Sequence, residues 1–275
     1  MTKWLHVIGV GTSLLSNFER ENPGKASDLG IKDWYRLSPN SPEQYRAEEE
    51  ADKGYSSIIF RELYDYLSRD PKRASAELNA FLRYTDKAGH SPPGEVGVLL
   101  YTTDTGVSWL VGRVLREYLV SKGYVVGEPL RIRGLGRSVN VFEEGLVNLV
   151  DEVVSRIIDA RRKGTLVYIN ATPGYKAETT FLVIAGLLAG AVSIYYIHEA
   201  FGEPVNLPTL PLSIRREVAE LLRKIDGSEK YLVEEVLGDY NYSVRVLRDM
   251  GLVEEVEGKV RVREWAKKII SLVGE

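Results

Sequence analysis

Short hydrophobic segments alternate with longer segments of helical periodicity along the first 200 positions of the chain. The short segments have the length and the β-branched content of buried strands: Trp4–Val10, Glu95–Tyr101, Pro129–Arg133, Thr165–Asn170 and Ala191–Ile197. Helical patterns lie between them, the longest being Ser41–Ser68, Asp70–Lys87 and Val141–Arg162. Repeated βα units of this kind predict an α/β fold, a Rossmann-like parallel sheet with helices on both faces.

The pattern changes after residue 201. Three prolines within 202–212 indicate a linker between domains: Pro204, Pro208 and Pro211. Beyond the linker, helical patterns cover 213–225, 228–237, 241–250 and 264–272, and 252–262 alternates like a β-hairpin with Gly258 at its turn. Three helices followed by a hairpin are the outline of a winged helix-turn-helix. We therefore expect domains at 1–201 and 213–275, joined by the linker 202–212.

One uncharged segment has to be considered as a membrane span. Phe181–Ile197 contains 17 residues, which is short of the roughly 20 that cross a bilayer. Its first half is rich in Leu and Ala, its second half is β-branched and aromatic, and Gly190 lies between them, so we expect a helix followed by a strand. The N-terminus runs directly into a strand-like segment and indicates no signal peptide, so we expect a cytoplasmic protein.

Composition excludes several kinds of chemistry. The 275 residues include no cysteine and three histidines, so disulfides, thiolate zinc sites, iron–sulfur clusters and a cysteine nucleophile are absent. A histidine-rich metal site has too few ligands, and we expect neither a metal nor a cofactor. The 36 Lys and Arg against 39 Asp and Glu give a net charge of −3, so no overall basic field favours nucleic acid.

Candidate chemistry lies in the turns that follow the strands. In an open parallel sheet, ligands bind at the carboxyl ends of the strands. Four turns there are polar and small: Gly11–Asn17, Thr102–Gly106, Arg133–Gly136 and Asn170–Lys176. Hydroxyl groups, backbone amides at helix starts and a few cations suit a phosphate ligand.

The first and last of these turns differ from the common nucleotide motifs. Gly9 and Gly11 begin a dinucleotide fingerprint, but Leu14 stands at its third glycine, so a nicotinamide enzyme is disfavoured. Lys176 opens a helix whose dipole it opposes, which favours an anionic partner, and its surroundings lack the order of a Walker A loop. Plainer interpretations stay open: Thr12 and Ser13 cap a helix, and Lys176 is a solvated lysine.

The segments 11–17 and 170–176 and the C-terminal winged-helix pattern together resemble CRISPR-associated CARF-domain proteins of type III systems. Within that group, the chain is most similar to the stand-alone ring nucleases of thermophilic archaea, and the resemblance covers almost the whole chain. It implies a homodimer that binds cyclic oligoadenylate, usually cyclic tetra-adenylate, across its two-fold axis. It further implies a metal-independent cleavage of the ring that ends type III antiviral signalling.

The resemblance also assigns residues. Ser13, with Thr12 beside it, would position a scissile phosphate, and Lys176 would stabilise the charge that develops on it. The pocket would further include Gly11, Asn17, Asn170, Thr172 and Gly174, and Pro173 stands where the family often has a glycine. Thr103, Asp104 and Arg133 are weaker candidates for adenine or ribose contacts, and Gly134 is a further ligand-binding candidate, although Asp104 is equally well explained as a turn residue. His198 ends the last strand at the ligand-binding edge and is a further candidate.

Two other functions, a HEPN ribonuclease and a sensor that regulates transcription, have partial support in the sequence. Arg83 and His90 have the spacing of a HEPN ribonuclease motif, but they fall inside the Rossmann-like region, where Gly89 and Pro92 break the helix. The other alternative is a non-catalytic sensor that regulates transcription through its winged helix. Residues 213–275 hold 12 Lys and Arg against 13 Asp and Glu, a balance that disfavours DNA binding without excluding it. His6 is expected to be a packed strand residue.

Overall fold

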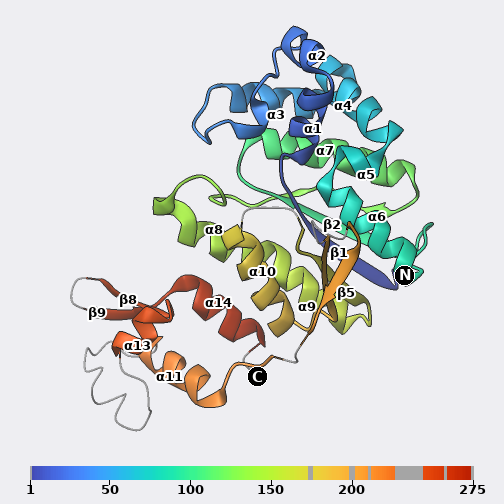
Figure 1. Cartoon of the computed structure of the whole chain (residues 1–275). Coiled ribbons are helices and arrows are strands. Elements are labelled where there is room, and N and C mark those ends of the chain that lie inside the picture. Colours follow the sequence, from blue (N-terminus) through green and yellow to red (C-terminus); the bar gives the residue numbers. More distant parts are fainter. Residues whose placement is uncertain are drawn as a thin grey trace. The chain divides into compact units, whose positions relative to one another are not determined.

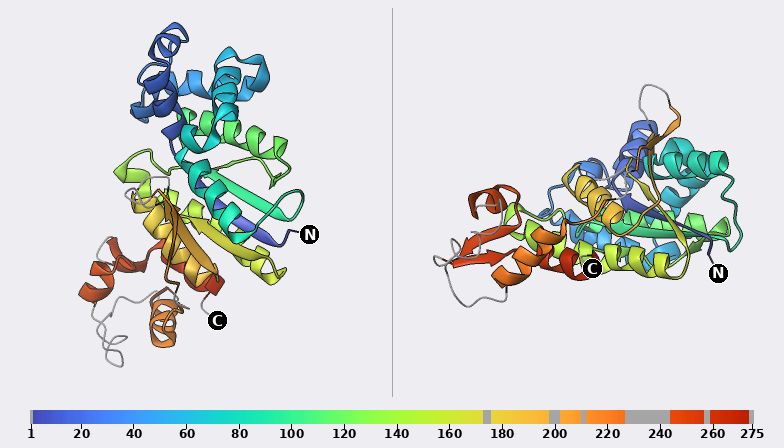
Figure 2. Two further views of the ribbon diagram at one scale, coloured as in Figure 1. Left: turned by 45° about the vertical axis from the view of Figure 1, so that its right-hand side comes forward. Right: turned by 90° about the horizontal axis from the view of Figure 1, so that it is seen from below.

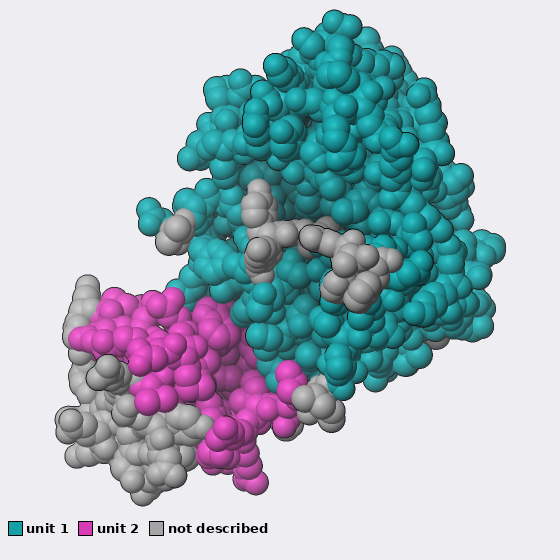
Figure 3. Space-filling model, viewed as in Figure 1, with its two compact units in different colours: residues 1–210 teal, residues 211–275 magenta. Residues whose placement is uncertain are grey.

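The computed structural model describes residues 2–172, 176–197, 202–209, 212–226, 244–256 and 259–273, with the backbone alone at 139, 176 and 244–245. The chain divides into two compact units (Figure 1, Figure 3). Unit 1 is Met1–Leu210 and unit 2 is Pro211–Glu275.

A seven-stranded sheet forms the centre of the described part of unit 1. Its strands are β1 (Trp4–Val10), β2 (Val96–Thr102), β3 (Val125–Val126), β4 (Leu130–Arg131), β5 (Leu166–Asn170), β6 (Ser193–Ile197) and β7 (Pro204–Leu207). The order is β3-β2-β1-β5-β6-β7, and β4 also pairs with β2. Every pairing is parallel except that of β6 with β7. The expected Rossmann-like fold is therefore present, with β1 at its centre.

The strand predictions hold for the central strands and fail at the edges. The strands expected at 4–10, 95–101, 165–170 and 191–197 are found as β1, β2, β5 and β6. The strand expected at Pro129–Arg133 shrinks to the two residues of β4, and β3 was not foreseen. Part of the expected linker is instead the strand β7, which pairs antiparallel with β6. Pro204 is its first residue, a position where a missing N–H does no harm to an edge strand.

The 85 positions between β1 and β2 form a helical layer with more and shorter helices than the two expected at 41–68 and 70–87. Its elements are α1 (Ser13–Glu21), α2 (Pro23–Asp28), η1 (Trp34–Arg36), α3 (Glu43–Lys53), η2 (Gly54–Ser56), α4 (Ile58–Arg69), α5 (Pro71–Ala74) and α6 (Ala76–Ala88). Gly54, at φ +53°, ends α3, and the Ser57 hydroxyl accepts a hydrogen bond from Phe60 N–H to start α4. Ser75 divides the second expected helix by capping α6 in the same way.

Two helical layers cover the two faces of the sheet (Figure 2). After β2 come α7 (Gly106–Ser121), η3 (Val139–Val141), α8 (Phe142–Leu149), the π-helical turn η4 (Val150–Val154), α9 (Ser155–Arg162) and α10 (Lys176–Leu188). Tyr168 of β5 lies against α6, whereas its neighbour Ile169 lies against Gly186 of α10. Since successive strand residues point to opposite faces, α6 and α10 cover different sides. The helix expected at 141–162 is confirmed, with η4 inside it.

Histidine and tyrosine side chains fill the core beneath α6. The fully buried His6 places its Nδ1 3.0 Å from the Tyr195 hydroxyl and its Nε2 3.1 Å from Nδ1 of His90. The ring of His90 stacks on Trp4 at 4.4 Å. Burial, followed by the proximity of His90, lowers the pKa of His6 well below its usual range. His6 is thus the packed strand residue that its apolar neighbours predicted.

Unit 2 contains α11 (Arg216–Asp226), α13 (Val244–Asp249), β8 (Val253–Val256), β9 (Lys259–Val262) and α14 (Glu264–Val273). The strands β8 and β9 pair antiparallel, as the alternation over 252–262 predicts, and the expected turn residue Gly258 lies outside the described residues. Leu221, Leu247 and Val253 are fully buried in the unit's own core, together with one face of α14. The helix expected at 228–237 lies outside the described residues, so the winged-helix arrangement stays a prediction.

The apolar segment 181–197 behaves as its sequence pattern suggests. It divides into the second half of α10 and the strand β6. Among the described residues, the helices are too short or too polar to span a bilayer.

The close contact between α3 and α7 requires a glycine at position 106. A Cβ added to Gly106 would lie 1.8 Å from the carbonyl oxygen of Gln44. We therefore expect Gly106→Ala to lower the free energy of unfolding by about 3 kcal/mol, measured by urea denaturation followed by tryptophan fluorescence.

Gly127→Ala is the matched control, because a Cβ at this exposed glycine would meet nothing within 4 Å. Its free energy of unfolding should change by less than about 0.5 kcal/mol. Equal stabilities of the two variants would show that α3 can move away from α7 at little cost.

Candidate functional site

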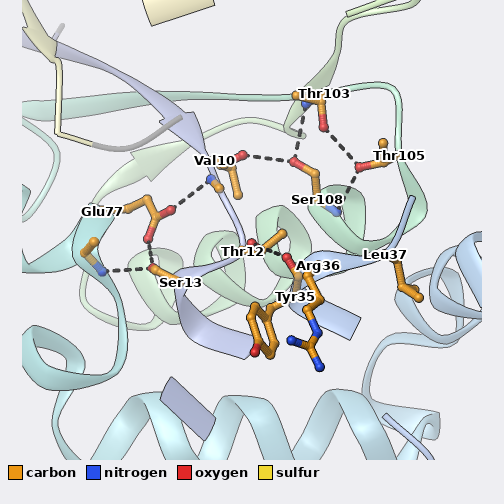
Figure 4. Close-up of a pocket in the computed structure, with 12 residues that line it drawn as sticks. Val10, Thr12, Ser13, Tyr35, Arg36, Leu37, Glu77, Thr103, Thr105 and Ser108 are labelled. Atoms are coloured by element: carbon orange, nitrogen blue, oxygen red, sulfur yellow. Dashed lines mark hydrogen bonds between the residues drawn. The ribbon is translucent and has the colours of Figure 1, made fainter. Parts of the chain in front are cut away.

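A cavity of about 400 Å³ opens at the carboxyl ends of β1 and β2 (Figure 4). Its wall comes from the β1 turn, the β2 turn, η1 and the start of α6, and most of its polar groups are hydroxyls. The lining residues are Val10, Gly11, Thr12, Ser13, Tyr35, Arg36, Leu37, Ala76, Glu77, Thr103, Thr105 and Ser108. The cavity thus unites four of the residues predicted from the sequence: Gly11, Thr12, Ser13 and Thr103.

Helix α1 opens onto this cavity without a side-chain cap. Thr12 stands at the N-cap position but makes no cap hydrogen bond. Its hydroxyl instead donates to the backbone carbonyl of Tyr35, 2.9 Å away, which ties the turn to η1. The first N–H groups of a helix are hydrogen-bond donors at the positive end of its dipole, so this end of α1 is suited to an anion.

The carboxylate of Glu77 occupies the turn after β1. One oxygen accepts the Gly11 N–H at 2.8 Å, and the other accepts the Ser13 hydroxyl at 2.5 Å and the Ser75 hydroxyl at 2.7 Å. Ser13 in turn accepts the Ala76 N–H at 3.0 Å. Glu77 is fully buried, although it lies at the cavity wall. The amide and the hydroxyl expected to meet a phosphate are therefore bonded to an anion of the chain itself (Figure 4).

The turn after β2 is held by hydroxyl groups. Thr103 Oγ1 lies 3.0 Å from Thr105 Oγ1, and the Ser108 hydroxyl donates to the carbonyl of Val10 at 2.9 Å. Gln44 of α3 reaches into the same turn and accepts the Val107 N–H at 3.0 Å. The Ser108–Val10 bond thus joins the start of α7 to the end of β1, and Gln44 joins the start of α7 to α3.

A second cavity, of about 330 Å³, lies beside the turn after β4. It is lined by Asn40, Asp104, Arg133, Gly134, Arg137, Ser138, Val141 and Glu144. It therefore holds the predicted residues Asp104, Arg133 and Gly134, apart from those of the first cavity. The Arg133 side chain is 85% exposed and lies 3.7 Å from the Glu144 carboxylate.

Asp104 is the hub of an ion-pair network. It accepts hydrogen bonds from Arg131 at 3.0 Å, from Arg137 at 3.2 Å and from the Gly134 N–H at 3.2 Å. Arg131 also donates to Glu48 of α3 at 2.6 Å. Burial acts to raise the pKa of Asp104, but the Gly134 N–H and the two arginines outweigh it and lower that pKa. Its side chain thus binds the chain's own cations rather than standing free for a ribose.

Asn17, Asn170 and Thr172 have structural partners. Asn17 donates to the carbonyls of Arg73 and Ala74 at the end of α5, at 3.2 and 3.1 Å. Asn170 donates to the Glu77 carbonyl at 3.1 Å and accepts the Thr172 N–H at 3.1 Å. The Thr172 hydroxyl accepts the Ile197 N–H at 3.0 Å and ties β5 to β6. None of the three is among the described residues that line the first cavity.

Other predicted residues fall outside what the structure describes. Pro173, Gly174 and His198 lie outside the described residues, and at Lys176 the backbone alone is described. The backbone of Lys176 begins α10, directly after the loop that follows β5. Because β1 and β5 pair in parallel, Ala171 and Thr172, which follow β5, lie at the same end of the strands as the Gly11–Ser13 turn.

The HEPN interpretation of Arg83 and His90 finds no support in their surroundings. His90 is buried between Trp4 and His6, and burial lowers its pKa. Arg83 donates to Asn79 of its own helix at 2.8 Å. Neither side chain lines the cavities described above.

Residues 72–210, just over half of the chain, match the model of a CRISPR-associated protein family, Cas_APE2256. The chain belongs to this family. The matched region begins in α5, includes Glu77 and the turns after β2, β4 and β5, and leaves out β1 and Ser13.

Sequence reasoning did not find Glu77, Arg36 or Arg137. Glu77 follows a serine cap in the first turn of a helix, where an acidic residue is ordinary. Its partners Ser13 and Gly11 lie 64 and 66 positions away along the chain, and no local pattern links them to it. Arg36 reaches the cavity through η1, a short turn with no strand or helix pattern in the sequence to mark it.

We expect the stabilising role of Asp104 to disappear at low pH. A carboxylate whose pKa is lower in the folded state than in the unfolded state stabilises the fold at pH values above the unfolded-state pKa. This stabilisation is lost as the pH falls through the folded-state pKa. Asp104→Asn should lower the thermal midpoint at about pH 7, and the difference from the wild type should shrink as the pH falls below about 4.

Asp28→Asn, which removes an exposed carboxylate at the end of α2, serves as the control. Its thermal midpoint should follow that of the wild type throughout. A difference between Asp104→Asn and the wild type that stays constant down to about pH 2 would contradict this role of the ion pairs.

Proposed function

We propose that this CRISPR-associated protein is a ring nuclease. It binds cyclic oligoadenylate, with cyclic tetra-adenylate as the preferred ring, and cleaves it without a metal to linear products that end in a 2′,3′-cyclic phosphate. The ring lies across the two-fold axis of a homodimer. Its cleavage ends the type III antiviral signal.

The first cavity carries this proposal. It lies at the carboxyl ends of β1 and β2, it is lined by hydroxyls, and α1 opens onto it without a side-chain cap. Arg36 adds a cation at the rim, with its side chain 65% exposed. A cavity with such donors suits phosphodiester oxygens, and membership of a CRISPR-associated family makes a signalling oligonucleotide a reasonable ligand.

In this reaction the protein has two roles: it aligns the substrate's own nucleophile and stabilises the charge that develops on the phosphate. The 2′-oxygen of one adenosine attacks the adjacent phosphorus, the O2′–P bond forms, and the P–O5′ bond breaks. Holding the nucleophile in line contributes several kcal/mol. Lys176 stabilises the charge on the phosphorane oxygens. Thr103 and Arg133, at the ends of β2 and β4, serve as contacts for the adenosine groups.

One observation favours a second candidate, a sensor that binds the ring without cutting it. Glu77 holds the proton of Ser13, so this hydroxyl does not point a donor at a phosphate in the structure described. In this case the ring would still occupy the cavity, and unit 2 would pass the signal on to a partner. Cleavage distinguishes the two functions.

Incubation with cyclic tetra-adenylate in EDTA, followed by chromatography, tests the proposal. The wild type should convert the ring to a linear product with a 2′,3′-cyclic phosphate. Lys176→Ala should slow this conversion about 100-fold or more, because a cationic donor to the transition state is lost. Lys163→Ala is the matched control, since this exposed lysine lies in the turn before β5, at the opposite edge of the sheet.

Two results would contradict the proposal: full activity of Lys176→Ala, or cleavage that requires a divalent cation. Tight binding of the ring by a wild type that leaves it intact would support the sensor instead. Light scattering during size-exclusion chromatography tests the homodimer, with twice the 30.9 kDa chain mass as the expected result.

A further inference from the structure

The hydroxyl of Ser13 cannot both bond to Glu77 as described and donate to a phosphate. A serine hydroxyl has one proton and two lone pairs. Its proton points to Glu77 Oε2, and one lone pair accepts the Ala76 N–H. The second lone pair has no partner among the described residues, and Ser13 lines the cavity. Toward a bound ligand, Ser13 therefore presents an acceptor.

The carboxylate of Glu77 acts as a hydrogen-bond acceptor in all three of its side-chain contacts. Its two oxygens receive three donors, from Gly11, Ser13 and Ser75, which matches an ionised carboxylate that has no proton to give. It is the one carboxylate among the described residues that line the cavity, where the other titratable side chains are Tyr35 and Arg36. A buried carboxylate behind a hydroxyl is an arrangement that can withdraw a proton through that hydroxyl.

We infer that Ser13 and Glu77 form a proton relay for the attacking 2′-hydroxyl, with Glu77 as the final acceptor. This inference rests on the proposed function. The 2′-hydroxyl donates its proton to Ser13 Oγ as the O2′–P bond forms, and Ser13 passes its own proton to Glu77 Oε2. When the P–O5′ bond breaks, the 5′-oxygen takes a proton from a solvent water. Glu77 then returns its proton to the resulting hydroxide, so atoms and charge balance.

The relay changes the role of Ser13 and assigns Glu77 the role of the base. Ser13 no longer positions the phosphate by donating to it, and instead accepts from the nucleophile. Gly11 and Ser75 hold the carboxylate in place, and Asn170 fixes its backbone by bonding to the Glu77 carbonyl. Gly11, Ser75 and Asn170 are thus positioning residues for the base.

Glu77→Gln tests the relay by removing the proton acceptor while keeping the size of the side chain. Single-turnover cleavage of cyclic tetra-adenylate should slow about 100-fold, which is the usual contribution of a general base. The Kd for the ring should stay the same or fall, because the amide donates to Ser13 and frees the serine proton for a phosphate oxygen.

Glu50→Gln is the matched control. Glu50 also accepts a serine hydroxyl, that of Ser57, but neither residue lines the cavity, so the cleavage rate should stay within about 3-fold of the wild type. Ser13→Ala breaks the relay at its first step and should slow cleavage as much as Glu77→Gln. The double variant should be no slower than either single variant, because the two residues act as a unit.

Cleavage by Glu77→Gln at the wild-type rate would overturn the relay. So would a double variant whose fold-loss in rate is the product of the two single losses, because the residues would then act independently. If Glu77→Gln does not fold, Ser13→Ala decides. For Ser13→Ala, an unchanged Kd for the ring with a slower cleavage rate supports the relay. A higher Kd with an unchanged rate at saturating ring concentration overturns it. Failure of the wild type to cut the ring contradicts the proposed function itself and is recognised before any variant is measured.

Discussion

One buried carboxylate joins the two ends of the helical layer in unit 1. Glu77 begins the last helix of that layer and bonds to the turn that begins its first helix. Hydrogen bonds to a charged group contribute more than neutral ones, about 1.5–3 kcal/mol each, and burial makes their loss costly. The shape of the cavity therefore depends on Glu77, whatever reaction takes place beside it.

The same carboxylate makes the distribution of charge around the cavity uneven. Among the described residues, the cavity wall contains one buried carboxylate, several hydroxyls and one exposed cation, Arg36, which is itself paired with Asp33. Under the proposed function, a phosphate would lie away from Glu77 and toward the start of α1 and Arg36, because like charges repel. Such a local group of donors would let a chain with a net charge of −3 bind the proposed ligand.

Much of the fold could be predicted from the sequence, because buried parallel strands leave a strong local signal. The central strands are continuous apolar segments, and the βα alternation indicates that they pair in parallel. The helical layer was harder to predict, since α1, α2 and η1 are short and polar and depend on contacts such as that of Thr12 with Tyr35. The strand β7 was missed because three nearby prolines resemble a linker.

The candidate site was predictable in its position and less so in its contacts. The rule that ligands bind at carboxyl strand ends placed Ser13 and Thr103 in one cavity. It could not reveal that Asp104 is bound by Arg131 and Arg137, or that Glu77 holds Ser13, because these partners come from distant parts of the chain. Side-chain pairing over such separations depends on the packed structure.

The helical layer also has a consequence for how the chain folds. In the sheet, Trp4 of β1 pairs with Val96 of β2, so a loop of about ninety residues must close before the central pair can form. For a flexible loop of that length, the closure entropy is about 4 kcal/mol. Any helix that formed within the insertion before the strands met would shorten the effective loop and lower this cost. The segment that shapes the cavity thus also sets the length of the loop that closes the central strand pair.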